Sequence, residues 1–93
     1  MSREKGFTEE IEKTFEDVKK LLNAMIKDRA VPRNIKRKAQ RGIDELHRED
    51  ESPGIIASNI IYLVDDLSQD PNIPFHIRTS VYRIISILEK IKD

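Results

Sequence analysis

The stretch that decides the fold reads DRAVPRNIK at residues 28–36, and a similar stretch, DPNIPFHIR, follows at residues 70–78. Both copies carry an aspartate, a proline four residues later and an isoleucine three residues after the proline. Proline disfavours helical backbone at the residue before it, here Val31 or Ile73. Each copy therefore predicts a sharp break between two helices.

The similarity extends beyond the two breaks at the same offset of 42 residues (28 to 70). The matching residues downstream are Arg41 and Arg83, Ile43 and Ile85, and Leu46 and Leu88. The chain is therefore predicted to contain two similar helical hairpins, at about residues 8–48 and 52–92, within a single domain over residues 1–93. Residues 1–6 carry no part of the pattern and are expected to be flexible.

Four residues of the breaks are expected to be structural: Asp28, Pro32, Asp70 and Pro74. A proline in the first turn of a helix loses no hydrogen bond, because the N–H groups there have no intrahelical partner. An aspartate before it can accept backbone N–H groups of the turn or of the next helix. We therefore interpret the two aspartates as structural rather than catalytic.

Apolar residues recur at helical spacing in four blocks. The blocks run from Phe7 to Met25, from Ile35 to Leu46, from Ile56 to Leu67 and from Ile77 to Ile91. Thr8 suits an N-cap, and so does Ser52, which is followed by a proline. These patterns predict an all-α fold, a four-helix bundle made of two similar hairpins that resemble HEAT repeats. Two repeats are few for an open solenoid, so a closed bundle is favoured.

The blocks at residues 27–36 and 70–78 resemble those of a small archaeal family of uncharacterised proteins. The resemblance covers nearly the whole chain from about Phe7 onward. It implies an archaeal, cytosolic protein of four helices, and it brings no activity, cofactor or catalytic residue.

Composition argues against several classes of protein. The chain has no cysteine, so it offers neither a disulfide framework nor a thiolate metal site. Its longest nearly apolar stretch, from Ile60 to Val64, is far shorter than the roughly 20 residues that span a bilayer. Seventeen basic residues balance seventeen acidic ones, which globally favours neither nucleic acid nor a membrane as partner. We expect a soluble, cytoplasmic protein without a membrane partner.

Basic residues nevertheless cluster in the middle of the chain, where seven of them and one acid lie between Lys27 and Arg41. The candidate anion or nucleic-acid patch consists of Arg33, Lys36, Arg37, Lys38 and Arg41. Arg33, Arg37 and Arg41 follow each other every four residues, so they form one row that could contact phosphates. The alternative is a solvated helix face whose charges pair with acids of the first helix. The patch has no aromatic residue, so base stacking is not supported.

The second half of the chain has more apolar residues than one core-facing helix stripe requires. The excess predicts a protein interface at Ile61, Tyr62, Phe75, Tyr82 and Ile87, where a second copy of the chain is the simplest partner. The alternative is that these helices lie centrally in the bundle.

No catalytic motif is present: the chain has three glycines in no phosphate-binding loop, and it has no HExxH. The two histidines, His47 and His76, show no partner set in the sequence, and we expect neither a metal nor a cofactor. A bundle of this size is expected to lack room for a pocket of about 300 Å³ or more. The prediction is a non-enzymatic interaction module that self-associates or binds a protein. The alternative is an accessory factor that binds RNA or the ribosome through the basic second helix.

Overall fold

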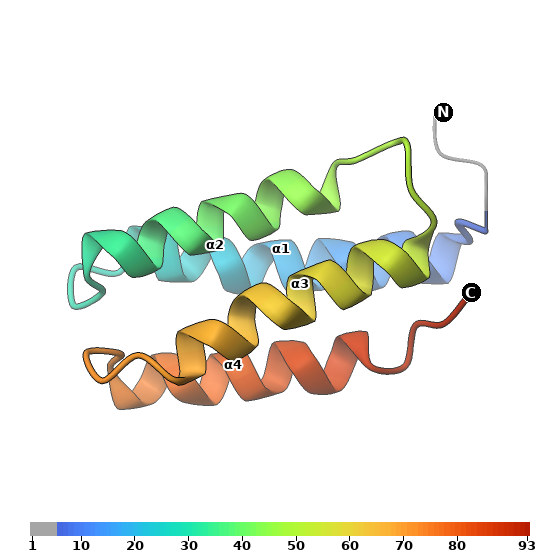
Figure 1. Cartoon of the computed structure of the whole chain (residues 1–93). Helices are drawn as coiled ribbons and strands as arrows, with labels where there is room; N and C mark the ends of the chain where they lie inside the picture. The colour runs from blue at the N-terminus through green and yellow to red at the C-terminus, as the bar shows by residue number, and fades with distance from the viewer. Residues whose placement is uncertain (1–5) are drawn as a thin grey trace.

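The computed structural model describes residues 6–93 as four α-helices. They are α1 (Glu9–Lys27), α2 (Arg33–Leu46), α3 (Pro53–Ser68) and α4 (Phe75–Leu88), shown in Figure 1. No strand occurs in the described range, and the prediction of an all-α fold is confirmed. Of the segment expected to be flexible, residues 1–5 lie outside the described residues.

The helices begin at the signals that the sequence carries. The Thr8 hydroxyl accepts the Ile11 N–H at 3.1 Å, and the Ser52 hydroxyl accepts the Ile55 N–H at 3.4 Å. Such caps satisfy backbone donors that have no partner in the first helical turn. α2 and α4 instead follow Pro32 and Pro74, whose backbone is extended, with ψ of 155° and 148°. The hydroxyl caps expected at Thr8 and Ser52 are present, whereas Pro32 and Pro74 are N-cap residues and precede the first turn in which the sequence had placed them.

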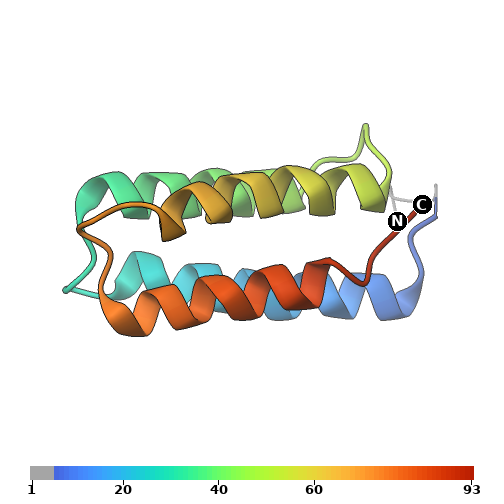
Figure 2. The same ribbon diagram turned by 60° about the horizontal axis from the view of Figure 1, so that its bottom comes forward.

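The four helices close into a bundle. α1 packs against α2 and α4, and α3 packs against the same two helices. Figure 2 shows the result as two layers, with α2 and α3 in one layer and α1 and α4 in the other. Both tight turns lie at one end of the bundle, which we call the turn end. The start of α1, the C-terminal residues and the α2–α3 connection lie at the other end.

The two tight turns at this end have the same hydrogen bonds. The Asp28 carboxylate accepts the Ala30 N–H, and the Asp70 carboxylate accepts the Asn72 N–H, each at 2.8 Å. The carbonyl groups of the same aspartates accept the N–H groups three residues later, each at 3.2 Å. The aspartates thus hold the backbone of both turns by the same contacts.

The core is apolar along the whole bundle. Its fully buried side chains include Leu22 of α1, Ile35 of α2, Ile60 of α3 and Ile84 of α4, each 0 % exposed. Gly42 faces Leu22 so closely that a Cβ at this position would lie 3.1 Å from Leu22 Cδ1. The absence of a side chain at Gly42 therefore allows α1 and α2 to approach each other.

Candidate interaction surfaces

Side chains of the two turns connect the hairpins at the turn end. His76 Nε2, at the start of α4, lies 2.6 Å from Asp28 Oδ2, at the end of α1. Asn34 Nδ2, at the start of α2, donates to Asp70 Oδ2 at 3.0 Å. The hydrogen bond from His76 is the main cause that lowers the pKa of Asp28, and the Ala30 N–H adds to it. The sequence did not reveal a partner for His76, because Asp28 lies 48 residues earlier in the chain.

Arg33, Arg37 and Arg41, the row predicted on the second helix, are exposed on α2. Neither these arginines nor the half-buried Lys36 form an ion pair with any described residue. Of the alternative interpretation, a solvated helix face paired with acids of the first helix, the solvent exposure is observed and the pairing is not found for this row. The antiparallel arrangement explains why, because it places the acidic start of α1 beside the far end of α2.

The assignment of Lys38 to the candidate anion or nucleic-acid patch is corrected by the structure, because its charge is already paired. Its ammonium group forms an ion pair with the Asp66 carboxylate of α3. Glu45 of the same helix also faces α3, since its carboxylate accepts from Asn59 Nδ2 at 2.7 Å. The side of α2 that carries Lys38 and Glu45 therefore faces α3, and both charged groups contact residues of that helix.

Three basic residues of α1 were not assigned to the predicted patch, although one of them, Lys27, had been counted in the basic cluster of the sequence. They are Lys19, Lys20 and Lys27, which are half-buried or exposed and form no ion pair in the described part of the chain. The sequence does contain a signal for a wider basic surface, because residues 19–40 include eight basic residues and a single acid, Asp28. The hairpin turn folds this segment back on itself, so both of its halves lie near the turn end.

The predicted apolar interface separates into exposed and packed residues. Tyr62, Phe75 and Tyr82 are 81 %, 80 % and 56 % exposed. Ile61 and Ile87 need a correction, because both are partly buried and pack against the core. Ile55, which the prediction omitted, is 44 % exposed. All four exposed large apolar side chains of residues 6–93 thus lie on α3 or α4.

Two groups of opposite charge accompany the aromatic side chains. Arg78 lies on α4 between Phe75 and Tyr82, three and four residues from them, and its guanidinium group makes no hydrogen bond or ion pair with a described residue. Its Nε is buried without a partner in this part of the chain. Asp65 of α3 is exposed, and its carboxylate is likewise unpaired within residues 6–93.

Both groups lie on the α3–α4 side of the bundle. On α4, His76 reaches the end of α1, and Arg78 lies roughly 200° around the helix from it, towards α3. On α3, Asn59 contacts α2, and Ile61 lies roughly 200° from it, towards α4. Asp65 neighbours Ile61 one helical turn later. Tyr62 lies about 60° around α3 from Asn59 and about 100° from Ile61, so it stands at the edge of this side. We call the surface formed by Asp65, Phe75, Arg78 and Tyr82, with Tyr62 at its edge, the aromatic face.

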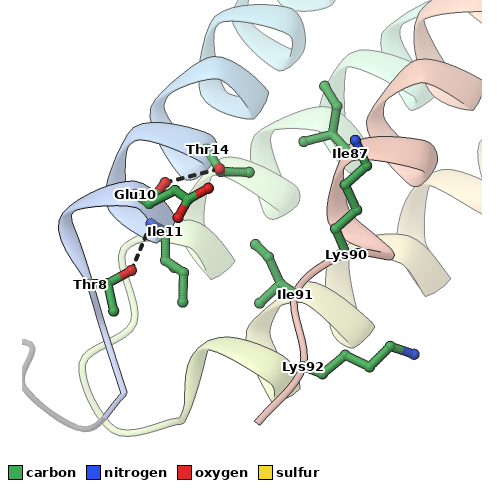
Figure 3. A pocket seen from close by; sticks show the side chains of 8 residues that line it. All are labelled: Thr8, Glu10, Ile11, Thr14, Ile87, Lys90, Ile91 and Lys92. Atoms are coloured by element: carbon green, nitrogen blue, oxygen red, sulfur yellow. Dashed lines mark hydrogen bonds between the residues drawn. The ribbon is translucent and has the colours of Figure 1, made fainter.

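A groove of about 390 Å³ lies between the start of α1 and the segment after α4. Figure 3 shows Ile11, Ile87 and Ile91 along it, with Glu10 and Lys90 at its rim. The expectation that no hollow of this size exists is therefore wrong. The reason is that the hollow opens at the bundle surface beyond the end of α4, whereas the helical core is filled.

No three histidine or carboxylate side chains in residues 6–93 lie together as metal ligands would. No described helix is long and apolar enough to cross a membrane.

These features define a small all-α protein of four antiparallel helices with two distinct surfaces, one basic and one aromatic. The chain belongs to the family described as "Uncharacterised protein family (UPF0147)", whose model matches residues 2–91. The archaeal resemblance noted in the sequence is thereby supported at the level of the family. The likeness of each hairpin to a HEAT repeat stays a prediction.

The relatives come from archaea. A UPF0147 protein of Methanothermobacter thermautotrophicus is 42 % identical over 80 residues, which cover 86 % of this chain and 78 % of the relative. One from Saccharolobus solfataricus is 45 % identical over 73 residues, covering 78 % of this chain and 82 % of the relative. The crystal structure of a UPF0147 protein from Thermoplasma acidophilum superposes with a TM-score of 0.81 at 33 % identity, over 89 % of this chain and 99 % of that one.

Proposed function

We propose that this protein is a non-enzymatic interaction module that forms a symmetric dimer through the aromatic face. One observation carries the proposal: every exposed large apolar side chain of the described residues lies on α3 or α4. The centres of protein interfaces are enriched in aromatic residues and arginine, and a few such residues supply most of the binding energy. Tyr62, Phe75, Tyr82 and Arg78 give the aromatic face this composition.

The choice of a second copy as the occupant rests on the charges of the face. In a two-fold interface, a residue i contacts a residue j of the partner, and j contacts i in return. An unpaired arginine and an unpaired aspartate on one face meet this requirement, because Arg78 of each copy can pair with Asp65 of the other. The same interface would bury Tyr62 and Tyr82, which lie near the midpoints of α3 and α4.

The absence of catalysis is part of the proposal and has its own support. The core side chains are apolar except for Ser68, and the carboxylates of Asp28, Asp70 and Asp93 are hydrogen-bonded to turns or to a helix start. The groove beside α1 has Glu10, Lys90 and Lys92 as its ionisable residues, and all three are exposed to solvent. Exposed groups of this kind lack the low-polarity surroundings that tune catalytic side chains.

The test is a charge swap read by sedimentation velocity over a wide range of concentrations. We expect the unmodified protein to dimerise, and Arg78→Asp or Asp65→Arg alone to shift it to monomer, since each apposes like charges. The double variant Arg78→Asp/Asp65→Arg should recover the dimer, because the pairs re-form with their signs exchanged. Recovery by the double variant is a result that loss of folding could not produce.

A second variant removes the apolar part of the face. Tyr62→Glu/Tyr82→Glu places two carboxylates at exposed positions, so circular dichroism should show an unchanged helix content while the dimer dissociates. The matched control is Lys13→Glu/Lys20→Glu, which adds two carboxylates to exposed positions of α1 and should leave the dimer intact. A monomer at every concentration for the unmodified chain would overturn the proposal.

A further inference from the structure

We infer that the opposite side of the bundle, formed by α1 and α2 near the turn end, binds the phosphate backbone of double-helical RNA. Six residues form this basic face: Lys19, Lys20, Lys27, Arg33, Lys36 and Arg37. The inference concerns the hairpin that the proposed dimer leaves uncovered, and it does not depend on dimer formation.

The basic face gains its charge from two helices. α1 and α2 run antiparallel on either side of a short turn, so Lys27 comes level with Arg33, and Lys20 comes level with Gln40. On α2, Lys38 and Glu45 face α3, so Lys36 lies on the other flank, towards α1. On α1, Asp28 reaches α4, and the flank that carries Lys19 is directed to α2. The tertiary structure thus converts a run of basic residues along the chain into one surface.

The six cations of this face form no ion pair with any described residue, although Lys36 lies close enough to Asp28 to lower its pKa slightly. The only acid in residues 19–40 is Asp28, and its carboxylate is occupied by His76 and by the Ala30 N–H. The row that Arg33 and Arg37 form on α2 rises about 6 Å from one residue to the other, at 1.5 Å per residue. Cations in such a row can contact successive phosphates, and each contact releases counterions from the nucleic acid.

The shape and chemistry of the face favour an RNA duplex over other polyanions. Residues 19–40 contain no aromatic residue, so a single strand would find no stacking platform. α2 is flanked by α1 and α3, and it does not project as a helix that enters the major groove of DNA would. An A-form duplex instead offers a wide, shallow minor groove between its phosphates, which suits a broad surface.

The composition of the basic face also argues against an anionic membrane as its partner. Helices that bind at a membrane surface bury large apolar side chains below the headgroups, beside their basic residues. The large apolar side chains that are exposed in residues 6–93 all lie on α3 or α4, in the other hairpin. The basic face would therefore meet a membrane by charge alone.

The experiment measures fluorescence anisotropy of a labelled RNA duplex at several salt concentrations, with duplex DNA of the same sequence, single-stranded RNA and phosphatidylserine vesicles as competitors. We expect affinity for the RNA duplex to fall linearly with salt on a double-logarithmic plot. Lys20→Gln/Arg37→Gln should lower the affinity and reduce the slope by about one for each lost phosphate contact. Both sites are exposed, so folding should be unaffected.

The matched control removes the same charge elsewhere. Arg83→Gln/Lys90→Gln alters two exposed basic residues on or after α4, outside the basic face, and should leave affinity and slope within error of the unmodified protein. Tyr62→Glu/Tyr82→Glu should also bind RNA through this face, which separates the inference from the proposed dimer. Equal weakening by the control pair, stronger competition by DNA, single strands or vesicles, or no binding to the duplex would each overturn the inference.

Discussion

His76 Nε2 lies 2.6 Å from Asp28 Oδ2, and this contact ties the first residues of α4 to the end of α1. Its counterpart, from Asn34 to Asp70 at 3.0 Å, ties the start of α2 to the end of α3. Asn34 and His76 are separated by the same 42 residues (34 to 76) as Asp28 and Asp70. The two hairpins therefore hold each other at the turn end by reciprocal contacts, in which an aspartate of each turn accepts from the other hairpin.

The first prediction concerns acid stability. The pKa of Asp28 is lowered from its ordinary value of 3.8, chiefly by the hydrogen bond from His76. A carboxyl whose pKa is lower in the folded state stabilises the fold above its unfolded pKa and loses this contribution as the pH falls through the folded value. We expect the melting temperature to drop below pH 3.8, and to drop less steeply in Asp28→Asn. Thermal unfolding followed by circular dichroism across the acid range measures both slopes.

The Asp28→Asn variant should retain part of the acid dependence. The pKa of Asp50 is also lowered, by its hydrogen bond from Arg48, and Asp50 is unchanged in the variant. Asp28→Asn/Asp50→Asn should therefore be flatter than either single variant. An acid slope that is the same with and without Asp28 would show that His76 does not stabilise the charged carboxylate.

The second prediction concerns the close approach of α1 and α2 at Gly42. A Cβ there would lie 3.1 Å from Leu22 Cδ1, which is the end of a flexible side chain. Gly42→Ala should change the free energy of unfolding by less than about 1 kcal/mol, because better helix propensity offsets the tight contact. Gly42→Leu overfills the same space and should destabilise by about 1–3 kcal/mol. Urea unfolding gives both values, and equal stability of the two variants would disprove the close contact.

The third prediction concerns the core, for which α3 offers a matched pair of isoleucines. Ile60 is 0 % exposed and Ile55 is 44 % exposed. Ile60→Ala should lower the free energy of unfolding by about 2–5 kcal/mol, because it leaves a cavity between the helices. Ile55→Ala should stay within about 0.5 kcal/mol of the unmodified protein, as surface substitutions usually do. Similar losses in the two variants would contradict the burial of Ile60.

The fourth prediction concerns the start of α3, where Asp93 is held. Its carboxylate accepts the Gly54 N–H at 2.8 Å and the Ser52 hydroxyl at 2.6 Å. A Cβ at Gly54 would lie 2.7 Å from Asp93 Oδ1, so an alanine there must displace the carboxylate. The two sites should therefore not be additive. We expect Gly54→Ala to gain up to about 1 kcal/mol of stability in an Asp93→Ala background, from helix propensity, and to gain less in the unmodified chain.

A double-mutant cycle by chemical unfolding measures this coupling. The control cycle pairs Asp93→Ala with Ala24→Gly, a change at an exposed position of α1 that has no contact with Asp93. Its two effects should add. Additive effects for Gly54→Ala and Asp93→Ala would mean that the carboxylate does not rest on the start of α3.

The two surfaces were predicted from the sequence to different extents. Tyr62, Phe75 and Tyr82 were recognised because they fall outside the apolar stripes of their helices, and the structure exposes all three. Ile61 and Ile87 were assigned to the same interface, but each lies at the edge of a stripe, where a neighbouring helix decides its burial. Lys38 was misassigned for the same reason, since Asp66 reaches it from another helix.

The sequence alone determined the number of helices, their start signals and the two breaks, because these depend on neighbours a few residues away. Helical periodicity, capping hydroxyls and the effect of proline on the preceding residue all act over this short range. Only the tertiary structure decided that His76 meets Asp28 and that the lysines of α1 join the arginines of α2. Those relationships depend on the order and facing of helices around the bundle, which arise from packing between residues far apart in the chain.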